Sequence, residues 1–163
     1  MAADRICFRP IGIIHSPFKI PHGTPIQPVG GKGIKGTVEI FPKYAAGLKD
    51  LVQFSYIMLI YNFHLSKKWS LIVKPFMDNK LRGVFATRAP RRPNPIGISV
   101  VRLLRRRKNI LYIEDLDMVD GTPLLDIKPY IPEFDYRKAR KIGWLKKRAR
   151  HVAIKRADGR FTR

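Results

Sequence analysis

The sequence predicts a mainly β protein: a single β-barrel or curled sheet with short helical excursions and a basic, helical C-terminal segment. Short segments rich in Ile, Val, Leu, Tyr and Phe recur along the 163 residues, and thirteen prolines and twelve glycines punctuate them. Many short strands with turn residues between them are typical of barrels. The hydrophobic content of 45% is enough to build a core in one domain of this length.

Six segments carry the strand composition: 11–16, 36–41, 54–63, 71–74, 97–104 and 110–116. Segment 54–63 is apolar at both alternating positions, which predicts a strand covered on both faces. Residues 105–109 (RRRKN) separate the last two segments and predict a basic hairpin turn. Residues 42–51 predict a short helix, because Pro42 suits a first helical position.

The charge indicates the class of partner. The chain holds 33 Lys and Arg residues against 12 acids, a formal net charge of +21. Such an excess favours a polyanion, either nucleic acid or an anionic membrane. The membrane is the weaker alternative, because the longest apolar stretch is about ten residues and a spanning helix needs about twenty. The N-terminus lacks the pattern of a secretion signal, and Cys7 is a single cysteine, so we expect a cytoplasmic protein.

Several common kinds of site are excluded by the motifs. The four histidines share no i, i+4 spacing and Cys7 has no cysteine partner, so we expect no metal site. No phosphate-binding GxxxxGK[ST] motif and no nucleophile elbow occur. Residues 30–33 (GGKG) lack the strand-then-helix frame of a dinucleotide loop and are predicted to form a flexible loop.

The tail, residues 137–163, differs from the rest of the chain. It carries twelve Lys or Arg residues and one acid, Asp158, a net charge of +11. Ile142, Leu145 and Ala149 recur at helical spacing, which predicts a helix with basic faces, although Gly143 disfavours it. A basic arm on a nucleic-acid backbone explains this block, because like charges repel unless an anion is near. A solvated tail that aids solubility is the alternative.

Five of the twelve acids lie close together, at positions 114, 115, 117, 120 and 126. Asp120-Gly121 is typical of a two-residue hairpin turn, which would place Asp117 opposite Leu124 and Asp115 opposite Asp126 on one face. An opposed carboxylate pair is unfavourable unless a cation lies between its members. The cluster therefore predicts a site for a cationic or hydroxyl-rich ligand, and surface pairing with arginines is the alternative.

Residues 88–95 (RAPRRPNP) combine three arginines with three prolines. Proline fixes φ, so such a loop keeps one shape at little entropic cost when it binds. The arginines are suited to hold a carboxylate or phosphate through two parallel hydrogen bonds. A proline-rich connection with solvated arginines is the alternative.

Two long motifs resemble those of the TrmO family, also called TsaA-like or YaeB-like. They are FATRAPRRPNPIG at residues 85–97 and LDMVDGTPLLDIKPYIP at residues 116–132, and shorter matches extend the resemblance over about residues 9–135. The resemblance implies a YaeB-like β-barrel domain at 1–136 followed by the basic tail at 137–163. It also implies a homodimer that methylates tRNA with S-adenosylmethionine. The implied target is N6 of threonylcarbamoyladenosine at position 37, 3′ of the anticodon.

The resemblance also assigns the site. The implied cofactor-binding residues are Pro25, Ile26, Gln27, His64, Leu65, Arg88, Ile98, Asp117, Met118, Val119 and Asp120. We expect Arg88, Arg91 or Arg92 to clamp a substrate carboxylate or phosphate. We expect Arg88 and Asp120 to be catalytic, with Asp120 as the acceptor of the N6 proton and the substrate's own carboxylate as a rival acceptor. Tyr56 and Tyr61 are candidate platforms for the target base.

The bacterial members of the family carry an extra C-terminal domain, and we expect the basic tail to take over its role in holding RNA. The predicted RNA-binding residues are Arg91, Arg92, Lys138, Lys141, Lys146, Lys147 and Arg148. Two alternatives stay open: a non-catalytic RNA-binding barrel, and a methyltransferase of the same fold that acts on a small molecule.

Overall fold

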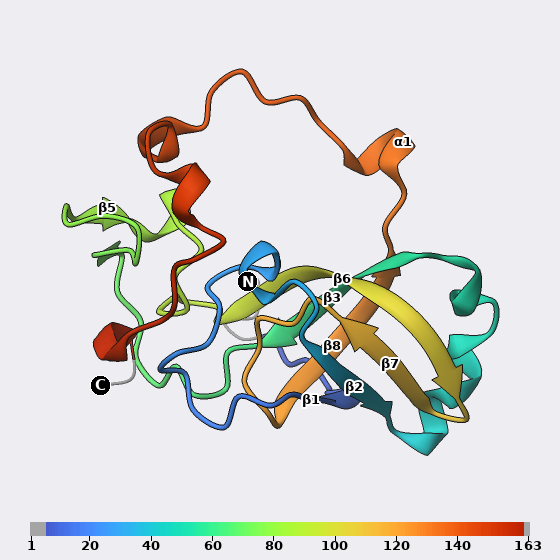
Figure 1. The fold of residues 1–163 in the computed structure, drawn as a ribbon. Helices are drawn as coiled ribbons and strands as arrows, with labels where there is room; N and C mark the ends of the chain where they lie inside the picture. The colour runs from blue at the N-terminus through green and yellow to red at the C-terminus, as the bar shows by residue number, and fades with distance from the viewer. Residues whose placement is uncertain (1–5, 162–163) are drawn as a thin grey trace, which may run out of the picture.

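The protein, described by a computed structural model over residues 6–161, is built on a closed antiparallel barrel (Figure 1). The predicted ranges 1–136 and 137–163 thus each extend outside the described residues. The barrel order is β1-β2-β7-β6-β3-β8. Its strands are β1 (Gly12–His15), β2 (Lys35–Ile40), β3 (Tyr56–Asn62), β6 (Ile96–Arg107), β7 (Ile110–Glu114) and β8 (Thr122–Pro129). The predicted barrel is confirmed.

The barrel interior is filled by one side chain in two from each strand. Fully buried side chains include Ile14, Val38, Ile57, Leu59, Val101, Leu111, Ile113 and Leu124. Each contributes about 1.5–3 kcal/mol relative to an exposed position, so the closed core dominates the stability of the barrel. The prediction that 54–63 is covered on both faces is wrong, because Tyr56 is exposed and Met58 and Ile60 are half-buried on the outer face.

The predicted hairpin at Asp120-Gly121 is also wrong. Asp115 adopts a left-handed conformation with φ 72°, which ends β7 and starts a loop at residues 115–121, here named the acidic loop. The amides of Asp120 and Gly121 donate to the carbonyls of Phe18 and Ile14. β8 therefore lies between β1 and β3 and pairs with both of them, and it does not pair with β7.

The helical excursions are short. Residues 42–51 form no α-helix but the 3-10 helices η2 (Pro42–Leu48) and η3 (Leu51–Gln53), and η1 (Pro28–Gly31) lies earlier in the chain. The hairpin turn between β6 and β7 is confirmed but is shorter than predicted, because residues 105–107 belong to β6 and only Lys108, at φ 54°, and Asn109 form the turn. α1 (Pro132–Asp135) follows the barrel. No helix within the described chain has the length and apolar character to cross a membrane.

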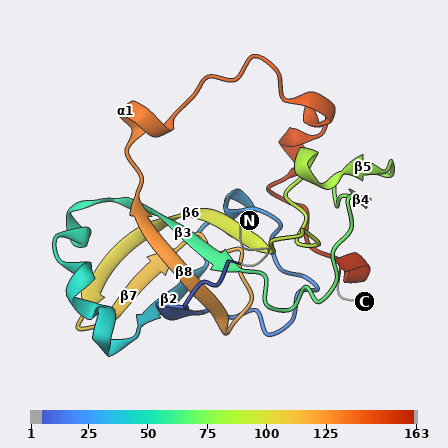
Figure 2. The ribbon, with the colours of Figure 1, turned by 180° about the vertical axis from the view of Figure 1, so that it is seen from behind.

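A long connection, residues 63–95 and here named the outer loop, leaves the barrel between β3 and β6. It contains the two-stranded sheet β4 (Ile72–Val73) and β5 (Arg82–Gly83), and η4 (Val84–Ala86). Its buried residues form a second small core with the end of the chain: Val73, Val84, Ala89 and Phe161, with Phe76 packed against them. Figure 2 shows the outer loop beside the C-terminal residues, away from the body of the barrel.

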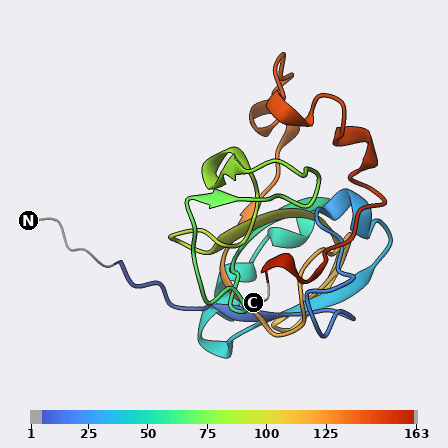
Figure 3. The same ribbon diagram turned by 90° about the vertical axis from the view of Figure 1, so that its left-hand side faces the viewer.

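The C-terminal strap, residues 143–161, is not the predicted continuous helix. It holds three separate 3-10 turns, η5 (Gly143–Leu145), η6 (Ala149–His151) and η7 (Gly159–Phe161). Gly143 takes φ 56°, which an α-helix cannot accommodate. The strap runs along the outer loop and past the loop of residues 16–34, here named the N-terminal loop (Figure 3). Packing against these loops, rather than helical periodicity, decides its path.

Candidate active site

One cavity joins the end of the barrel to the outer loop and the strap. Its volume is about 690 Å³, within the range that holds small-molecule cofactors. Most of its wall is apolar, and a few polar side chains converge on it, among them Gln27, His64, Arg88, Arg92 and Asp117. This composition is typical of a site that buries an organic ligand and orients it through a few polar contacts.

The cavity brings together nearly all residues predicted for the cofactor. They come from three segments far apart in sequence: the N-terminal loop, the end of β3, and the region where the outer loop, β6 and the acidic loop meet. The lining includes Pro25, Ile26, Gln27, His64, Leu65, Arg88, Ile98, Asp117, Met118 and Val119, but not Asp120. Their individual roles stay predictions.

The proline-rich segment is tied directly to the N-terminal loop. Arg88 Nη1 donates a hydrogen bond to Gln27 Oε1, so the two predicted cofactor segments meet through their side chains. Arg92 Nη1 donates to the carbonyls of Val84 and Thr87, at 3.1 and 2.8 Å, and its guanidinium lies over the Phe85 ring. Arg92 thus stabilises the segment itself, in addition to any contact that it makes with RNA.

Asp117 is a cavity-lining carboxylate with a raised pKa. It accepts a hydrogen bond of 2.7 Å from Ser99 Oγ, which lies 3.1 Å from the hydroxyl of Tyr61. Desolvation in the cavity wall raises the pKa of Asp117 to about 7, although Ser99 and the nearby Arg88 oppose the shift. Burial, followed by the Asp117 charge, also raises the pKa of Tyr61. Near neutral pH Asp117 can therefore gain or lose a proton.

The Tyr61 ring packs directly against the backbone of Gly97. A Cβ built at Gly97 would lie 2.4 Å from Tyr61 Cε2, well inside van der Waals contact. Position 97 needs a glycine because the Tyr61 ring lies so close to the backbone there, and not because of its φ angle. The candidate stacking platform Tyr61 is thus buried beside Ser99, whereas Tyr56 is exposed on the outer face of the barrel and does not line the cavity.

Asp120 has a different environment from Asp117. Its Oδ1 accepts a hydrogen bond from the Ser16 amide at 3.0 Å, and its Oδ2 lies 2.7 Å from Lys19 Nζ. The hydrogen bond from Lys19 is the largest influence that lowers the pKa of Asp120. A carboxylate with a lowered pKa that pins the acidic loop to the N-terminal loop is a poor proton acceptor. These contacts do not support the predicted role of Asp120 as base. Asp117, which lines the cavity and has a raised pKa, is the stronger candidate for that role.

The rest of the acidic cluster is used in surface pairing. Glu114 pairs with Arg102 at 3.4 Å, and Asp126 pairs with Lys128 at 2.9 Å. Asp115 accepts from the amide of Gly33 at 2.9 Å. Asp117 fits the interpretation of the cluster as a ligand site, because it alone among these five acids lines the cavity. The other four fit the alternative, in which the acids make contacts outside the cavity.

His64 lies at the cavity wall just after β3. Its backbone amide donates to the carbonyl of Asn62 at 2.8 Å, which fixes the turn out of the barrel. Desolvation lowers the pKa of its imidazole, which favours the neutral form of His64. A neutral imidazole can donate or accept a hydrogen bond without adding positive charge beside a cationic ligand.

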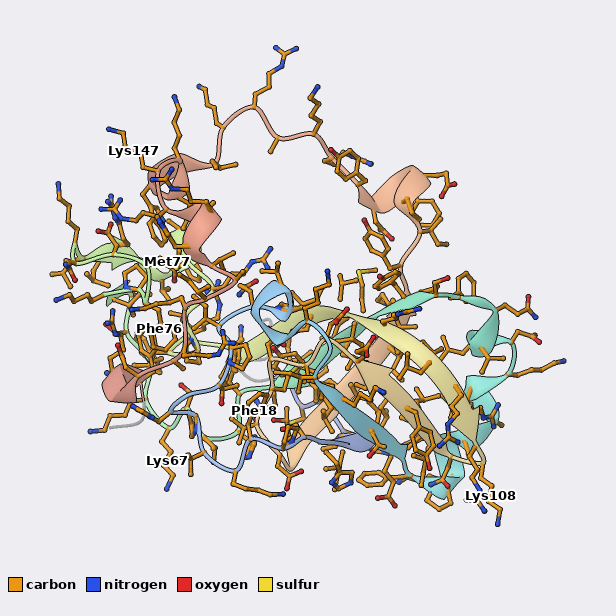
Figure 4. The ribbon with its side chains drawn as sticks, in the orientation of Figure 1. Phe18, Lys67, Phe76, Met77, Lys108 and Lys147 are labelled. Carbon is orange, nitrogen blue, oxygen red and sulfur yellow. The ribbon has the colours of Figure 1, made fainter. Side chains whose placement is uncertain are left out.

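The predicted RNA-binding residues have two kinds of environment. Lys138, Lys141, Lys146 and Lys147 are exposed, and the Lys147 side chain points outward from the strap (Figure 4). Arg148 is half-buried, and its Nη2 lies 3.1 Å from Asp78. Arg91 is half-buried in the proline-rich segment. The four lysines are thus the accessible charges, and Arg148 anchors the strap.

Sequence reasoning missed the contribution of the strap to the cavity. The lining also includes Trp144, Leu145, Val152, Ala157, Asp158 and Phe161. The signal that could have found them is the presence of apolar and aromatic residues inside a basic block. Phe76 and Met77 of the outer loop were missed as well, and Figure 4 shows both on the side of the molecule where the strap runs.

Comparisons with known proteins identify relatives of this chain. The family model described as the tRNA-methyltransferase O N-terminal domain matches residues 13–136. A protein from Pyrococcus abyssi described as a probable S-adenosyl-L-methionine-binding protein is 61% identical, over 96% of this chain and 85% of its own. The Escherichia coli tRNA (adenine(37)-N6)-methyltransferase is 39% identical, over 77% of this chain and 57% of its own.

The fold agrees with solved structures as well. The crystal structure of TrmO from Pseudomonas aeruginosa superposes with a TM-score of 0.72 at 37% sequence identity. The match covers 86% of this chain and 62% of the solved chain, so this chain spans less than two thirds of that protein. The C-terminal strap lies beyond the residues that the family model matches.

Proposed function

This chain belongs to the TrmO family, and from that premise we propose that it transfers a methyl group from S-adenosylmethionine to N6 of an adenosine in tRNA. The substrate that we propose in finer detail is threonylcarbamoyladenosine at position 37, in the anticodon loop. The similarity to proteins described as S-adenosyl-L-methionine-binding supports the methyl donor.

One observation carries the proposal: a half-buried carboxylate with a raised pKa lines a largely apolar cavity of about 690 Å³. The methyl donor combines an adenine, which suits an apolar wall, with a positively charged sulfur and an amino group. A cation bound near Asp117 would favour its ionised form and compensate the desolvation of that carboxylate. The cavity residues therefore fit this donor by size, polarity and charge.

The donor supplies an electrophilic methyl group on a cationic sulfur, and the chain must position the nucleophile and remove its proton. A carbamoylated N6 is a weak nucleophile until it is deprotonated. We assign the uptake of that proton to Asp117, because its pKa of about 7 in the empty site lies near the working pH and a bound cation favours its ionised form. Ser99 orients the carboxylate by donating to one of its oxygens, which leaves the other oxygen to receive the proton.

Arg88 has the geometry of a clamp. Its guanidinium is held by Gln27 and lines the same cavity as Asp117. A guanidinium that keeps one hydrogen bond to the protein can offer its remaining N–H groups to a carboxylate or phosphate. We assign it to the carboxylate of the threonylcarbamoyl group or to a neighbouring phosphate of the anticodon loop.

The exposed lysines of the tail support contact with RNA. Lys138, Lys141, Lys146 and Lys147 are exposed along the chain that leads from α1 into the strap, and the neighbouring Trp144 and Leu145 line the cavity. Neutralisation of phosphates by such residues makes binding salt-dependent and independent of sequence. The cavity then selects the nucleotide, and the lysines hold the tRNA.

We further propose that the protein acts as a homodimer in the cytoplasm. The outer loop exposes a group of large apolar side chains, Trp69, Leu71, Ile72 and Leu81, each more than half exposed. Exposed apolar groups of this kind are typical of interaction surfaces. Sedimentation velocity should give twice the mass of the chain, and a monomer at micromolar concentration would contradict the proposed dimer.

The decisive test is mass spectrometry of tRNA nucleosides after incubation with the protein and isotope-labelled S-adenosylmethionine. We expect labelled N6-methyl-threonylcarbamoyladenosine from tRNAs that carry the modified base, and no label in tRNAs that lack it. Donor binding without any labelled nucleoside would indicate a methyltransferase for a small molecule. Binding of tRNA without binding of the donor would indicate a non-catalytic RNA-binding barrel.

A further inference from the structure

The C-terminal strap is anchored to the outer loop by several polar contacts. Trp144 Nε1 donates to the Ala86 carbonyl at 2.8 Å, and Arg160 Nη1 donates to the Pro75 carbonyl at 2.7 Å. Arg148 pairs at 3.1 Å with Asp78, whose side chain is only 1% exposed. A buried carboxylate needs such partners, so the pairing holds the middle of the strap in place.

An apolar anchor secures the end of the strap. Phe161 is 8% exposed and packs edge-to-face on Phe76, with ring centroids 4.9 Å apart. Both rings belong to the second core and both line the cavity. The barrel has a separate core, so this anchor can be altered without touching the barrel interior.

The strap is also paired with the N-terminal loop through the backbone. The amide of Ala157 donates to the Thr24 carbonyl, and the amide of Gly23 donates to the Ala157 carbonyl, each at 2.8 Å. A β-bridge joins Pro25 to Arg156. These contacts lie next to Pro25, Ile26 and Gln27, which line the cavity, so the strap fixes the part of the N-terminal loop that faces the ligand.

The strap also has two kinds of surface. Trp144, Leu145 and Val152 face the cavity, whereas Lys146 and Lys147 are exposed. A solvated RNA-binding arm would need the lysines but would not need an aromatic side chain in a ligand cavity. The strap therefore does more than supply positive charge.

We propose that the C-terminal strap is an integral wall of the methyl-donor site, with Trp144 beside the bound donor and residues 156–157 positioning the N-terminal loop. This inference rests on the proposed function, because it takes the cavity to be the donor site. The strap lies outside residues 13–136, so the family match does not assign this role to it.

The test uses S-adenosylhomocysteine, the unreactive product of the donor, as the probe of the cavity. Calorimetry compares the unaltered protein with two variants that loosen the strap at different places. Phe161→Ala removes the apolar anchor, and Ala157→Pro removes the amide that donates to Thr24. Ile154→Ala is the matched control, because Ile154 lies in the same strap, is 77% exposed and is not among the cavity-lining residues.

We expect both loosened variants to bind the probe at least about tenfold more weakly, and the control to stay within about twofold of the unaltered protein. Trp144 gives a second measurement, since the chain has two tryptophans and Trp69→Phe leaves Trp144 as the remaining one. Its fluorescence should change as the probe saturates the site. Near-ultraviolet circular dichroism and the melting temperature show whether the barrel of each variant is intact.

Unchanged affinity in both loosened variants would overturn the inference while leaving the proposed function in place. Calorimetric binding with no change in Trp144 fluorescence would refute the contact between Trp144 and the donor. If the unaltered protein binds no probe, the proposed function itself fails, and the inference fails with it.

Discussion

Replacing Asp117 by asparagine should abolish methylation and make the protein more stable at the same time. Asparagine keeps the shape of the side chain and an oxygen that can accept from Ser99, but it cannot take up the N6 proton. Loss of a general base costs roughly 10² to 10⁴ in rate. The opposite effects on rate and stability separate a catalytic carboxylate from a structural one.

The expected gain in stability follows from the pKa of Asp117. Its ordinary value is 3.8 and its value in the folded protein is about 7. As the pH rises from about 4 to 7, the unfolded chain loses this proton and the folded chain retains it, so the carboxyl destabilises the fold increasingly and then by a constant amount above pH 7. The limit is about 4 kcal/mol, and solvent screening of this half-buried carboxylate lowers the expected effect to about 1–2 kcal/mol.

Thermal melts of the unaltered protein and Asp117→Asn, each measured at pH 4, 6 and 8, test this reasoning. The difference in melting temperature should be near zero at pH 4 and largest at pH 8, several degrees for about 1–2 kcal/mol in a chain of this size. Methylation by the unaltered protein should rise with pH up to about 7. A difference independent of pH, or a variant that methylates at the normal rate, would refute the role given to Asp117.

Three further changes test other parts of the site. Arg88→Ala should lower methylation at least about tenfold while the barrel melts normally, because the clamp is removed and Gln27 no longer has its donor; normal activity would remove Arg88 from the site. Lys146→Ala with Lys147→Ala should make the slope of log affinity for tRNA against log salt shallower by about 0.7–0.9 for each phosphate that is no longer neutralised; an unchanged slope would exclude both lysines from the RNA interface. Gly97→Ala should cost about 1–3 kcal/mol of stability, because the new methyl group meets the adjacent tyrosine ring; equal melting temperatures would contradict the close packing described there.

The composition of the short apolar segments, with turn residues between them, was enough to predict most of the barrel. Segments 11–16, 36–41, 97–104 and 110–116 all overlap strands of the structure, and the turn predicted at 105–109 contains the observed turn at 108–109. The reason is local: a strand that lines a closed core must bury every second side chain, whatever its neighbours are. The two long motifs likewise indicated the family and most of the residues that line the cavity.

Which segments pair was not visible in the sequence. Asp120-Gly121 is typical of a hairpin turn, yet the left-handed Asp115 ends β7 early and the amides of 120 and 121 bond to the N-terminal loop and β1. The helical spacing of Ile142, Leu145 and Ala149 similarly gave way to contacts with the outer loop and the N-terminal loop. In both cases distant contacts outweighed a weak local preference.

The sequence by itself determined that this chain forms a barrel with an arginine-bearing loop, an acidic loop and a basic tail. Only the tertiary structure decided that Asp117 rather than Asp120 is the acid of the acidic loop that lines the cavity, and that the strap forms part of the wall. The physical reason is desolvation: the pKa of a carboxylate depends on what surrounds it in space, and those surroundings come from segments far apart in the chain.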